Sequence, residues 1–94
     1  MKKYNVAVVG ATGLVGRTFL KVLAEYDFPI NNLILYASKR SAGKVINFKG
    51  KDYTIVELTK DAFDGVEIAL FSAGGSVSKE YAPIAVSKGA VVVD

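Results

Sequence analysis

The sequence predicts an α/β fold built on a mainly parallel β-sheet with flanking helices. Two observations carry this prediction. Short valine-rich runs of strand length alternate with segments of helical periodicity, and a glycine-rich turn follows the first run. The composition agrees, since 51% hydrophobic and 22% charged residues are typical of a globular chain. With 94 residues the chain is long enough for one small domain, but it is shorter than a typical α/β enzyme.

The first part of the chain is predicted to form strand, helix and strand. Residues Tyr4–Val9 are an apolar run ended by Gly10, which predicts a buried strand. Residues 13–26 have apolar side chains at helical spacing, which predicts a helix, and Pro29 helps to end that helix. Residues 33–37, LILYA, are a second apolar run of strand length. The helical face expected to be buried consists of Val15, Phe19, Val22, Leu23 and Tyr26.

A β-hairpin insertion is predicted next. Residues 45–48 and 52–58 have strand character and flank the Lys-Gly-Lys sequence at 49–51. Residues 59–65 predict a short helix or turn, and the apolar residues 66–71 predict another buried strand.

The last part of the chain predicts a helix and a strand. Residues 78–88 form the helix, which Gly89 closes, and Pro83 is expected either early in it or at a kink. Residues 90–94, AVVVD, form the strand. A parallel strand normally leads into a covering helix or a working loop. The sequence is therefore expected to be truncated, the first part of a longer protein.

The sequence VAVVGATGLVG places glycines at positions 10, 13 and 16, a G-x-x-G-x-x-G variant of the dinucleotide-binding fingerprint. In that motif one glycine permits the tight turn, a second lets the backbone approach the phosphates, and a third lets the helix pack close to the strand. The amides near residues 12–15 would then face a pyrophosphate, with the helix dipole behind them. The context predicts a Rossmann-like nucleotide-binding fold; the alternative is a structural strand–turn–helix without a ligand.

The residues after the second strand indicate which nucleotide is bound. An NAD site usually has an acidic residue there, but residues 38–41 are Ser-Lys-Arg-Ser. The Arg40 guanidinium and the two serines suit the 2′-phosphate of NADP; the alternative is a solvated basic loop. Five of the twelve basic residues lie between positions 39 and 51, which leaves a general anion-binding surface open as well. Nucleic acid is not expected, because the only interleaved aromatics are Phe48 and Tyr53.

A second glycine-rich loop, SAGGS at residues 72–76, follows the strand at 66–71. It is expected at the same edge of the sheet as the first turn, where small residues would let a cofactor lie against the backbone. The alternative is an ordinary strand–helix connection.

Several classes of site and location are not expected. The chain has no cysteine and no histidine, which excludes disulfides, thiolate metal sites and the commonest nucleophile–base pairs; no metal and no catalytic residue are therefore predicted. The net charge of +3 does not by itself indicate a membrane surface. No apolar run approaches the roughly 20 residues of a membrane helix, and a signal peptide is not expected. A soluble, cytoplasmic protein is predicted.

Three segments together, VAVVGATGLVG, ASKRSAGK and ALFSAGGSVSKEYAPIAVSKGAVVVD, resemble the N-terminal region of bacterial aspartate-β-semialdehyde dehydrogenases. The resemblance runs the length of the chain. It implies an oxidoreductase of the aspartate pathway to lysine, threonine and methionine. That enzyme uses NADPH to convert β-aspartyl phosphate into aspartate β-semialdehyde and phosphate, usually as a homo-oligomer.

The resemblance also implies a set of NADP contacts. These are Gly10, Thr12, Gly13, Leu14, Val15, Ser38, Arg40, Ser41, Ser72, Ala73 and Gly74. The family's cysteine nucleophile and histidine acid/base have no counterpart here. Residues 1–94 are thus expected to be the N-terminal part of the NADP-binding domain, without the catalytic and dimerisation domain, and to be inactive alone.

Three alternatives remain at the level of sequence. The related N-acetyl-γ-glutamyl-phosphate reductases perform the same chemistry on another acyl phosphate, although the two Ser-Ala-Gly segments favour the aspartate enzyme. Short-chain reductases also open with Gly-Ala-Thr-Gly, but none of the five tyrosines here has a lysine four residues later. A non-catalytic NAD(P)-sensing module is the third.

Overall fold

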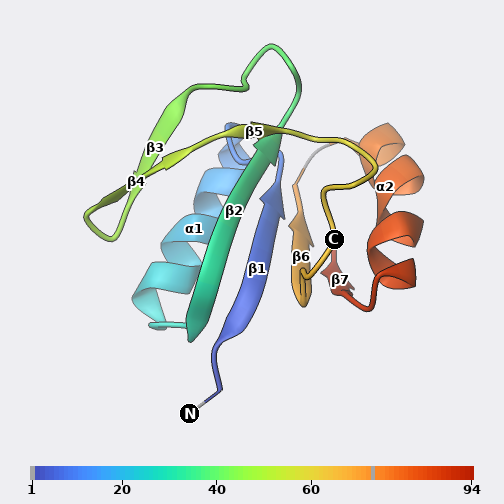
Figure 1. Cartoon of the computed structure of the whole chain (residues 1–94). Coiled ribbons are helices and arrows are strands. Elements are labelled where there is room, and N and C mark those ends of the chain that lie inside the picture. Colours follow the sequence, from blue (N-terminus) through green and yellow to red (C-terminus); the bar gives the residue numbers. More distant parts are fainter. Residues whose placement is uncertain (1, 73) are drawn as a thin grey trace.

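The computed structural model describes residues 2–72 and 74–94 and has a five-stranded parallel sheet at its centre. The strand order is β5-β2-β1-β6-β7, so the chain builds outward from β1 in both directions (Figure 1). The strands are β1 Tyr4–Val9, β2 Ile30–Ala37, β5 Val56–Glu57, β6 Ile68–Phe71 and β7 Val91–Val93. This arrangement confirms the predicted Rossmann-like α/β fold.

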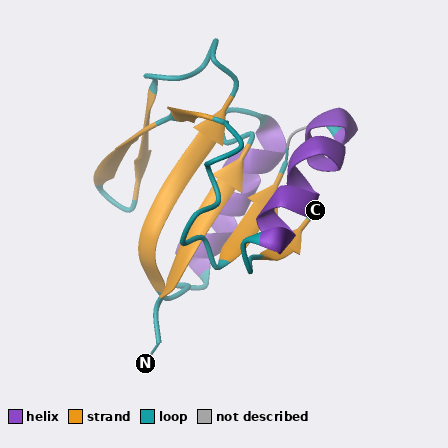
Figure 2. Ribbon diagram, turned by 45° about the vertical axis from the view of Figure 1, so that its right-hand side comes forward, coloured by secondary structure: helices purple, strands orange, loops and turns teal. Residues whose placement is uncertain are grey.

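Two helices cover the sheet from opposite faces (Figure 2). Helix α1, Leu14–Glu25, packs on the face that carries Val6 and Val8 of β1. Helix α2, Gly75–Ser87, packs on the face that carries Ala7 and Val9. Successive strand residues point to opposite faces, so β1 is buried on both sides, as its uninterrupted apolar run predicts.

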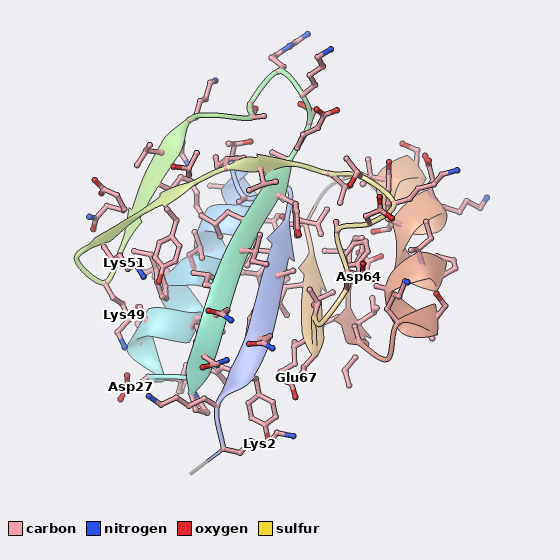
Figure 3. The ribbon with its side chains drawn as sticks, viewed as in Figure 1. Lys2, Asp27, Lys49, Lys51, Asp64 and Glu67 are labelled. Atoms are coloured by element: carbon pink, nitrogen blue, oxygen red, sulfur yellow. The ribbon has the colours of Figure 1, made fainter. Side chains whose placement is uncertain are left out.

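The predicted hairpin forms a separate two-stranded sheet, β3 Val45–Phe48 and β4 Lys51–Thr54. Its turn has two residues, Lys49 and Gly50, with positive φ of 52° and 81°, as in the turns that suit the twist of a hairpin. The tip is tied to the turn after α1 by an ion pair of 2.6 Å between Lys49 Nζ and Asp27 Oδ1; both residues are labelled in Figure 3.

The expectation of one strand over 52–58 is wrong. Strand β4 ends at Thr54, and β5 then pairs in parallel with β2 at the edge of the main sheet. The change of sheet takes place at Ile55, which is buried in the core beside α1 and whose N–H donates to the carbonyl of Lys44. A single apolar residue therefore anchors the crossing between the two sheets.

The face predicted to be buried on α1 is also partly wrong. Val15, Val22 and Tyr26 are exposed by 53%, 43% and 79%. The fully buried residues are Gly16, Leu20 and Leu23. The helix carries two overlapping apolar stripes. The stripe that contains Gly16 is the buried one, because a residue without a side chain permits the closest approach to the sheet. Leu23 is buried as predicted, and Phe19 packs partly buried against the core. Counting apolar side chains gives glycine no weight, which is why Gly16 was not predicted.

Helix α2 begins at Gly75, three residues before the predicted start at residue 78. Pro83 is therefore the ninth of its 13 residues and does not lie early in the helix. Since proline has no N–H, the carbonyl of Lys79 loses its usual helical partner. Two residues after Pro83, the buried Ala85 packs against the sheet.

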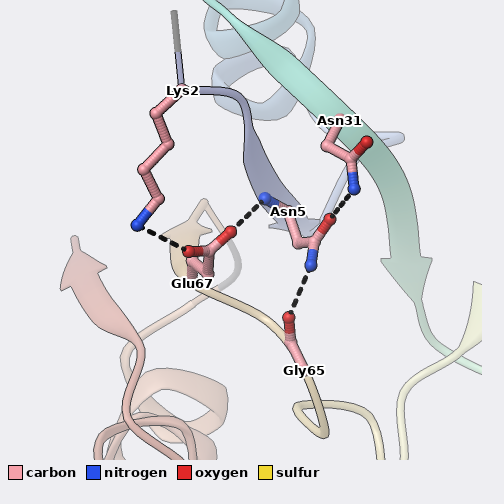
Figure 4. A network of polar contacts seen from close by, with 5 residues as sticks. All are labelled: Lys2, Asn5, Asn31, Gly65 and Glu67. Atoms are coloured by element: carbon pink, nitrogen blue, oxygen red, sulfur yellow. Dashed lines mark hydrogen bonds and ion pairs between the residues drawn. The ribbon is translucent and has the colours of Figure 1, made fainter.

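A polar network joins the amino-terminal ends of three neighbouring segments (Figure 4). The Asn5 N–H donates to Glu67 Oε1 at 2.9 Å, and the Asn5 side chain donates to the carbonyl of Gly65 at 3.0 Å. Asn31 Nδ2 donates to Asn5 Oδ1 at 2.9 Å. Lys2 Nζ lies 3.5 Å from Glu67 Oε2. The network fixes β1 between β2 and the approach to β6.

This network gives the fold a dependence on acid that can be measured. The Asn5 N–H bond lowers the pKa of Glu67 from its ordinary value of 4.5, and the Lys2 charge acts in the same direction. The stabilisation is thus present above pH 4.5 and is lost as the pH falls through the lowered pKa. We expect Glu67→Gln to flatten the acid limb of a plot of unfolding free energy against pH, measured by urea denaturation.

Glu25→Gln is the matched control, because within residues 2–72 and 74–94 the ion pair of Glu25 is an exposed one with Lys21 at 4.0 Å. Its acid limb should follow that of the wild type. Coincident curves for Glu67→Gln and the wild type would contradict the assignment.

The face of β6 and β7 on the α1 side forms an apolar groove of about 630 Å³. Val91 and Val93 lie along it and are exposed by 64% and 44%. Among the described residues that line this groove, none belongs to the two glycine-rich segments at 10–16 and 72–76.

Candidate functional site

The candidate site lies where the direction of strand order reverses. From β1 the chain moves through α1 to β2 on one side, whereas β6 lies on the other side and leads through α2 to β7. In open α/β sheets, ligands bind at the carboxyl ends of the strands at such a switch point. Both predicted glycine-rich loops, after β1 and after β6, are located there.

The turn after β1 is fixed by backbone hydrogen bonds. Gly10 has a φ of 85°, in the left-handed region that favours glycine. Its N–H donates to the carbonyl of Tyr36 at 2.8 Å, and the N–H of Ala11 donates to the same oxygen at 3.2 Å. The N–H of Gly13 donates back to Gly10 at 3.1 Å. The turn is therefore fastened to the end of β2 and closed on itself.

Both helices that border the site begin without a side-chain cap. Gly13 precedes α1 and Gly74 precedes α2, and neither helix has an acidic residue in its first turn. The first N–H groups of a helix have no partner within it, and the helix dipole makes that end positive. Two such ends at adjacent strands form an environment that favours an anion. Leu14 and Val15, the first two residues of α1, are exposed by 84% and 53%.

The glycines of the fingerprint have different roles in the structure. A Cβ at Gly16 would lie 2.3 Å from the carbonyl oxygen of Gly10 and 2.8 Å from the Cα of Ala11, a clash with backbone. A Cβ at Gly13 would meet its nearest neighbour, the Gly10 oxygen, at 3.5 Å, an ordinary contact. Gly16 is therefore required by packing, whereas Gly13 leaves open space beside the helix start.

The loop after β6 contacts the turn through Ser72. Its hydroxyl lies 2.8 Å from the carbonyl oxygen of Val9 and 3.0 Å from that of Gly10, and its N–H donates to Val9 at 2.9 Å. Ala73, one of the predicted contacts, lies outside the described residues. Gly74 is present at the start of α2, with its carbonyl accepting the N–H of Val77 at 3.0 Å.

The basic loop after β2 forms a compact turn. The carbonyl of Ser38 accepts the N–H groups of Ser41 at 2.9 Å and Ala42 at 3.1 Å. The Arg40 side chain is exposed, and no ion pair within residues 2–72 and 74–94 involves it. Arg40 thus lies with Ser38 and Ser41 in one turn at the end of β2.

A cavity of about 420 Å³ lies between these loops. It is lined by Val9, Gly10, Thr12, Gly13, Ala37, Ser38, Leu58, Ser72, Val77 and Tyr81. Five of the predicted residues line it, whereas Leu14, Val15, Arg40, Ser41 and Gly74 do not. The groove on the flat of the sheet is larger, but this cavity is the one that combines residues of the first glycine turn, of the loop after β6 and of the loop after β2 among the described parts of the chain.

Sequence reasoning missed the apolar wall of this cavity, which consists of Leu58, Val77 and Tyr81. Val77 and Tyr81 are four residues apart and share one face of α2. That spacing was visible in the sequence, but the helix was predicted to begin only at residue 78. Leu58 directly follows β5, whose place in the main sheet was not predicted.

Tyr36 is a buried residue whose carbonyl oxygen holds the glycine turn. Its phenol donates to the carbonyl of Ala62 at 2.7 Å, and burial raises the pKa of Tyr36, so the group stays neutral. Within the described residues no group of three or more His, Cys, Asp or Glu side chains could hold a metal ion. The described helices include none that is long and apolar enough to cross a membrane.

Comparison with known proteins agrees with the resemblance to aspartate-semialdehyde dehydrogenases found in the sequence. The family model "Semialdehyde dehydrogenase, NAD binding domain" matches residues 5–94. An aspartate-semialdehyde dehydrogenase of Aquifex aeolicus is 63% identical over 97% of this chain and 27% of its own length. One from Bacillus subtilis is 54% identical over 96% of this chain and 26% of its own length.

A solved structure agrees with the sequence relatives. Aspartate semialdehyde dehydrogenase II of Vibrio cholerae superposes with a TM-score of 0.91 at 49% identity, covering 99% of this chain and 30% of that one. The chain thus spans somewhat more than a quarter of the length of these relatives. Since the family model covers nearly every residue, the chain belongs to the semialdehyde dehydrogenase NAD-binding domain family.

Proposed function

We propose that this chain is the NADP-binding portion of an aspartate-semialdehyde dehydrogenase. The observation that carries the proposal is the pair of uncapped helix starts that follow β1 and β6, beside a cavity lined by Gly13, Ser72 and Ser38, the last of which lies in a basic loop without a carboxylate. A nicotinamide dinucleotide needs such a place for its pyrophosphate, and its 2′-phosphate needs a cation. The names of the relatives support the assignment to an aspartate-semialdehyde dehydrogenase.

The pyrophosphate is assigned to the first turn. The N–H groups of Leu14 and Val15 at the start of α1 would donate to it, and Gly13 leaves room for its approach. The second uncapped start, at Gly74, would face the same dinucleotide from β6. The other proposed contacts in these two loops are Gly10, Thr12 and Ala73, while Ser72 lies at the edge of the cavity between them.

The adenosine half is assigned to the cavity and the basic loop. Leu58, Val77 and Tyr81 supply an apolar wall for the adenine ring. Ser38 lies at the cavity edge, and Arg40 and Ser41 follow it within one turn. Arg40 and the serine hydroxyls would bind the 2′-phosphate, because a guanidinium offers paired donors that match phosphate oxygens.

The remaining chemistry is assigned to the rest of a longer protein. NADPH supplies a hydride when bound, and the proposed reaction converts β-aspartyl phosphate into aspartate β-semialdehyde and phosphate. The nucleophile and the acid/base of that reaction are not among these 94 residues, which contain no cysteine or histidine. We therefore expect no turnover from this chain alone, and we propose a cytoplasmic homo-oligomer that acts in amino-acid biosynthesis.

Arg40→Ala tests the cofactor assignment. A hydrogen bond to a charged group contributes about 1.5–3 kcal/mol, so the variant should bind NADP about 10- to 100-fold more weakly. Affinity for NAD should stay within about twofold, since NAD has no 2′-phosphate for Arg40 to bind. Isothermal titration calorimetry with both cofactors measures the two effects.

Lys60→Ala is the control for net charge, because Lys60 is exposed in the segment after β5, outside the cavity lining. It should bind both cofactors as the wild type does. An equal loss of NAD and NADP affinity in Arg40→Ala would contradict the 2′-phosphate assignment. Wild-type protein that binds neither cofactor would contradict the proposed function itself.

A further inference from the structure

Ser72 is placed at the junction of three elements. It directly follows β6, its hydroxyl reaches the last residue of β1 and the first glycine of the turn, and it touches the position where Gly16 of α1 would carry a Cβ. The distances are 2.8 Å to the Val9 oxygen, 3.0 Å to the Gly10 oxygen and 2.9 Å to the ideal Gly16 Cβ. The side chain is half-buried and also borders the cavity.

Both hydrogen-bond donors of Ser72 are already in use. Its N–H donates to Val9, and its single hydroxyl hydrogen is shared between two carbonyl oxygens. Phosphate oxygens only accept hydrogen bonds. Ser72 could therefore donate to a phosphate only by leaving Val9 and Gly10, whose oxygens would then lose this partner.

The carbonyl of Gly10 is the point where this bond acts on the turn. That oxygen accepts the N–H of Gly13 at 3.1 Å, and Gly13 is the residue from which α1 begins. Backbone bonds to Tyr36 hold the turn on the β2 side, and the Ser72 hydroxyl is the side-chain bond that holds it on the β6 side. The Ser72 hydroxyl and the N–H of Gly13, the residue before α1, thus share one acceptor, the Gly10 oxygen.

We propose that Ser72 is a positioning residue: its hydroxyl locks the glycine turn to β6 and so keeps the two uncapped helix starts aligned before a cofactor arrives. This inference rests on the proposed function, because alignment has a purpose only if the helix starts share one ligand. It differs from direct cofactor contact in a measurable way, since the lock exists in the cofactor-free protein.

The test compares Ser72→Ala with Ser87→Ala. Ser87 is a matched control, because its hydroxyl also donates to a backbone carbonyl, that of Ile84 at 2.7 Å, but at the far end of α2. Amide hydrogen exchange is followed by NMR in the cofactor-free proteins. In Ser72→Ala the Gly13 amide should exchange about tenfold faster than in the wild type, while Leu35 in the core of β2 should keep its rate.

Affinity for the cofactor gives the second readout. Ser72→Ala should weaken NADP and NAD by the same factor, about tenfold, because the turn serves the pyrophosphate that both contain. Ser72→Thr, which retains a hydroxyl, should restore the Gly13 exchange rate and the affinity. Ser87→Ala should leave both unchanged.

Two results would overturn the inference. If the Gly13 exchange rate is unchanged in cofactor-free Ser72→Ala, Ser72 does not hold the turn, and any loss of affinity then comes from direct contact. If Leu35 and Gly13 accelerate together, the hydroxyl only stabilises the whole fold. Wild-type protein that binds neither cofactor would reject the proposed function, while the exchange rates would still decide the role of Ser72.

Discussion

Replacing Gly16 with alanine is expected to lower the stability of the fold more than replacing Gly13, Gly74 or Gly75 with alanine. The new Cβ would lie 2.3 Å from the Gly10 oxygen and 2.8 Å from the Ala11 Cα, both of them backbone atoms that cannot rotate away. Overpacking of this kind costs about 3 kcal/mol at the upper end of its usual range. For a domain of this size that corresponds to a fall of about 12–24 °C in Tm, measured by circular dichroism.

Gly75→Ala is the matched control for Gly16→Ala. Gly75 also lies in the first turn of a helix, and among the described residues beyond its chain neighbours and its own helix backbone, no atom lies within 4 Å of a Cβ placed there. Its Tm should be unchanged or slightly raised, because alanine loses less entropy than glycine in a helix. A Gly16→Ala variant as stable as Gly75→Ala would show that α1 does not approach the turn as closely as described.

Replacing Gly13 with valine is expected to have the opposite pattern, with binding lost and the fold retained. Gly13 has a φ of −76°, which any residue can adopt, and its Cβ position is free of close contacts. Loss of a favourable helix cap should cost no more than about 1 kcal/mol. The branched side chain would occupy the space beside the first N–H groups of α1, so affinity for NADP should fall about 100-fold or more, equal to about 2.8 kcal/mol.

NAD provides the internal comparison for Gly13→Val. Both cofactors carry the pyrophosphate, so both affinities should fall together, unlike the selective loss expected for Arg40→Ala. Calorimetry gives the affinities, and thermal unfolding establishes that the variant is folded. Unchanged affinity in a folded Gly13→Val protein would remove the turn from the binding site.

Much of the fold could be predicted because its local patterns were strong. The apolar run of β1 and the Lys49–Gly50 turn each have one favourable structure, and both are as predicted. The prediction of the α1 face was right for Leu23 and wrong for Val15, Val22 and Tyr26, because the buried face depends on a close approach at Gly16 that involves another part of the chain. The start of α2 was missed because Gly74 and Gly75 were assigned to a loop by composition.

The site was predictable where it depends on backbone geometry and less so where it depends on tertiary contacts. Gly10 and Gly13 could be identified from their spacing next to a strand and a helix. Tyr81 and Leu58 could not, because they reach the cavity only when α2 and β5 take their places around it. The bonds of Ser72 to Val9 and Gly10 join residues 62 or more positions apart, and no local pattern encodes them.

The central claim is that NADP binds across the two uncapped helix starts with its 2′-phosphate at the basic loop. Titration of the wild-type chain with NADP and with NAD, followed by backbone amide shifts in NMR spectra, tests it most directly. The account predicts that both cofactors shift Gly13, Leu14 and Val15, and that NADP alone shifts Arg40 and Ser41 strongly and binds more tightly. Shifts confined to the apolar groove at Val91 and Val93, or no saturable shifts at all, would contradict it.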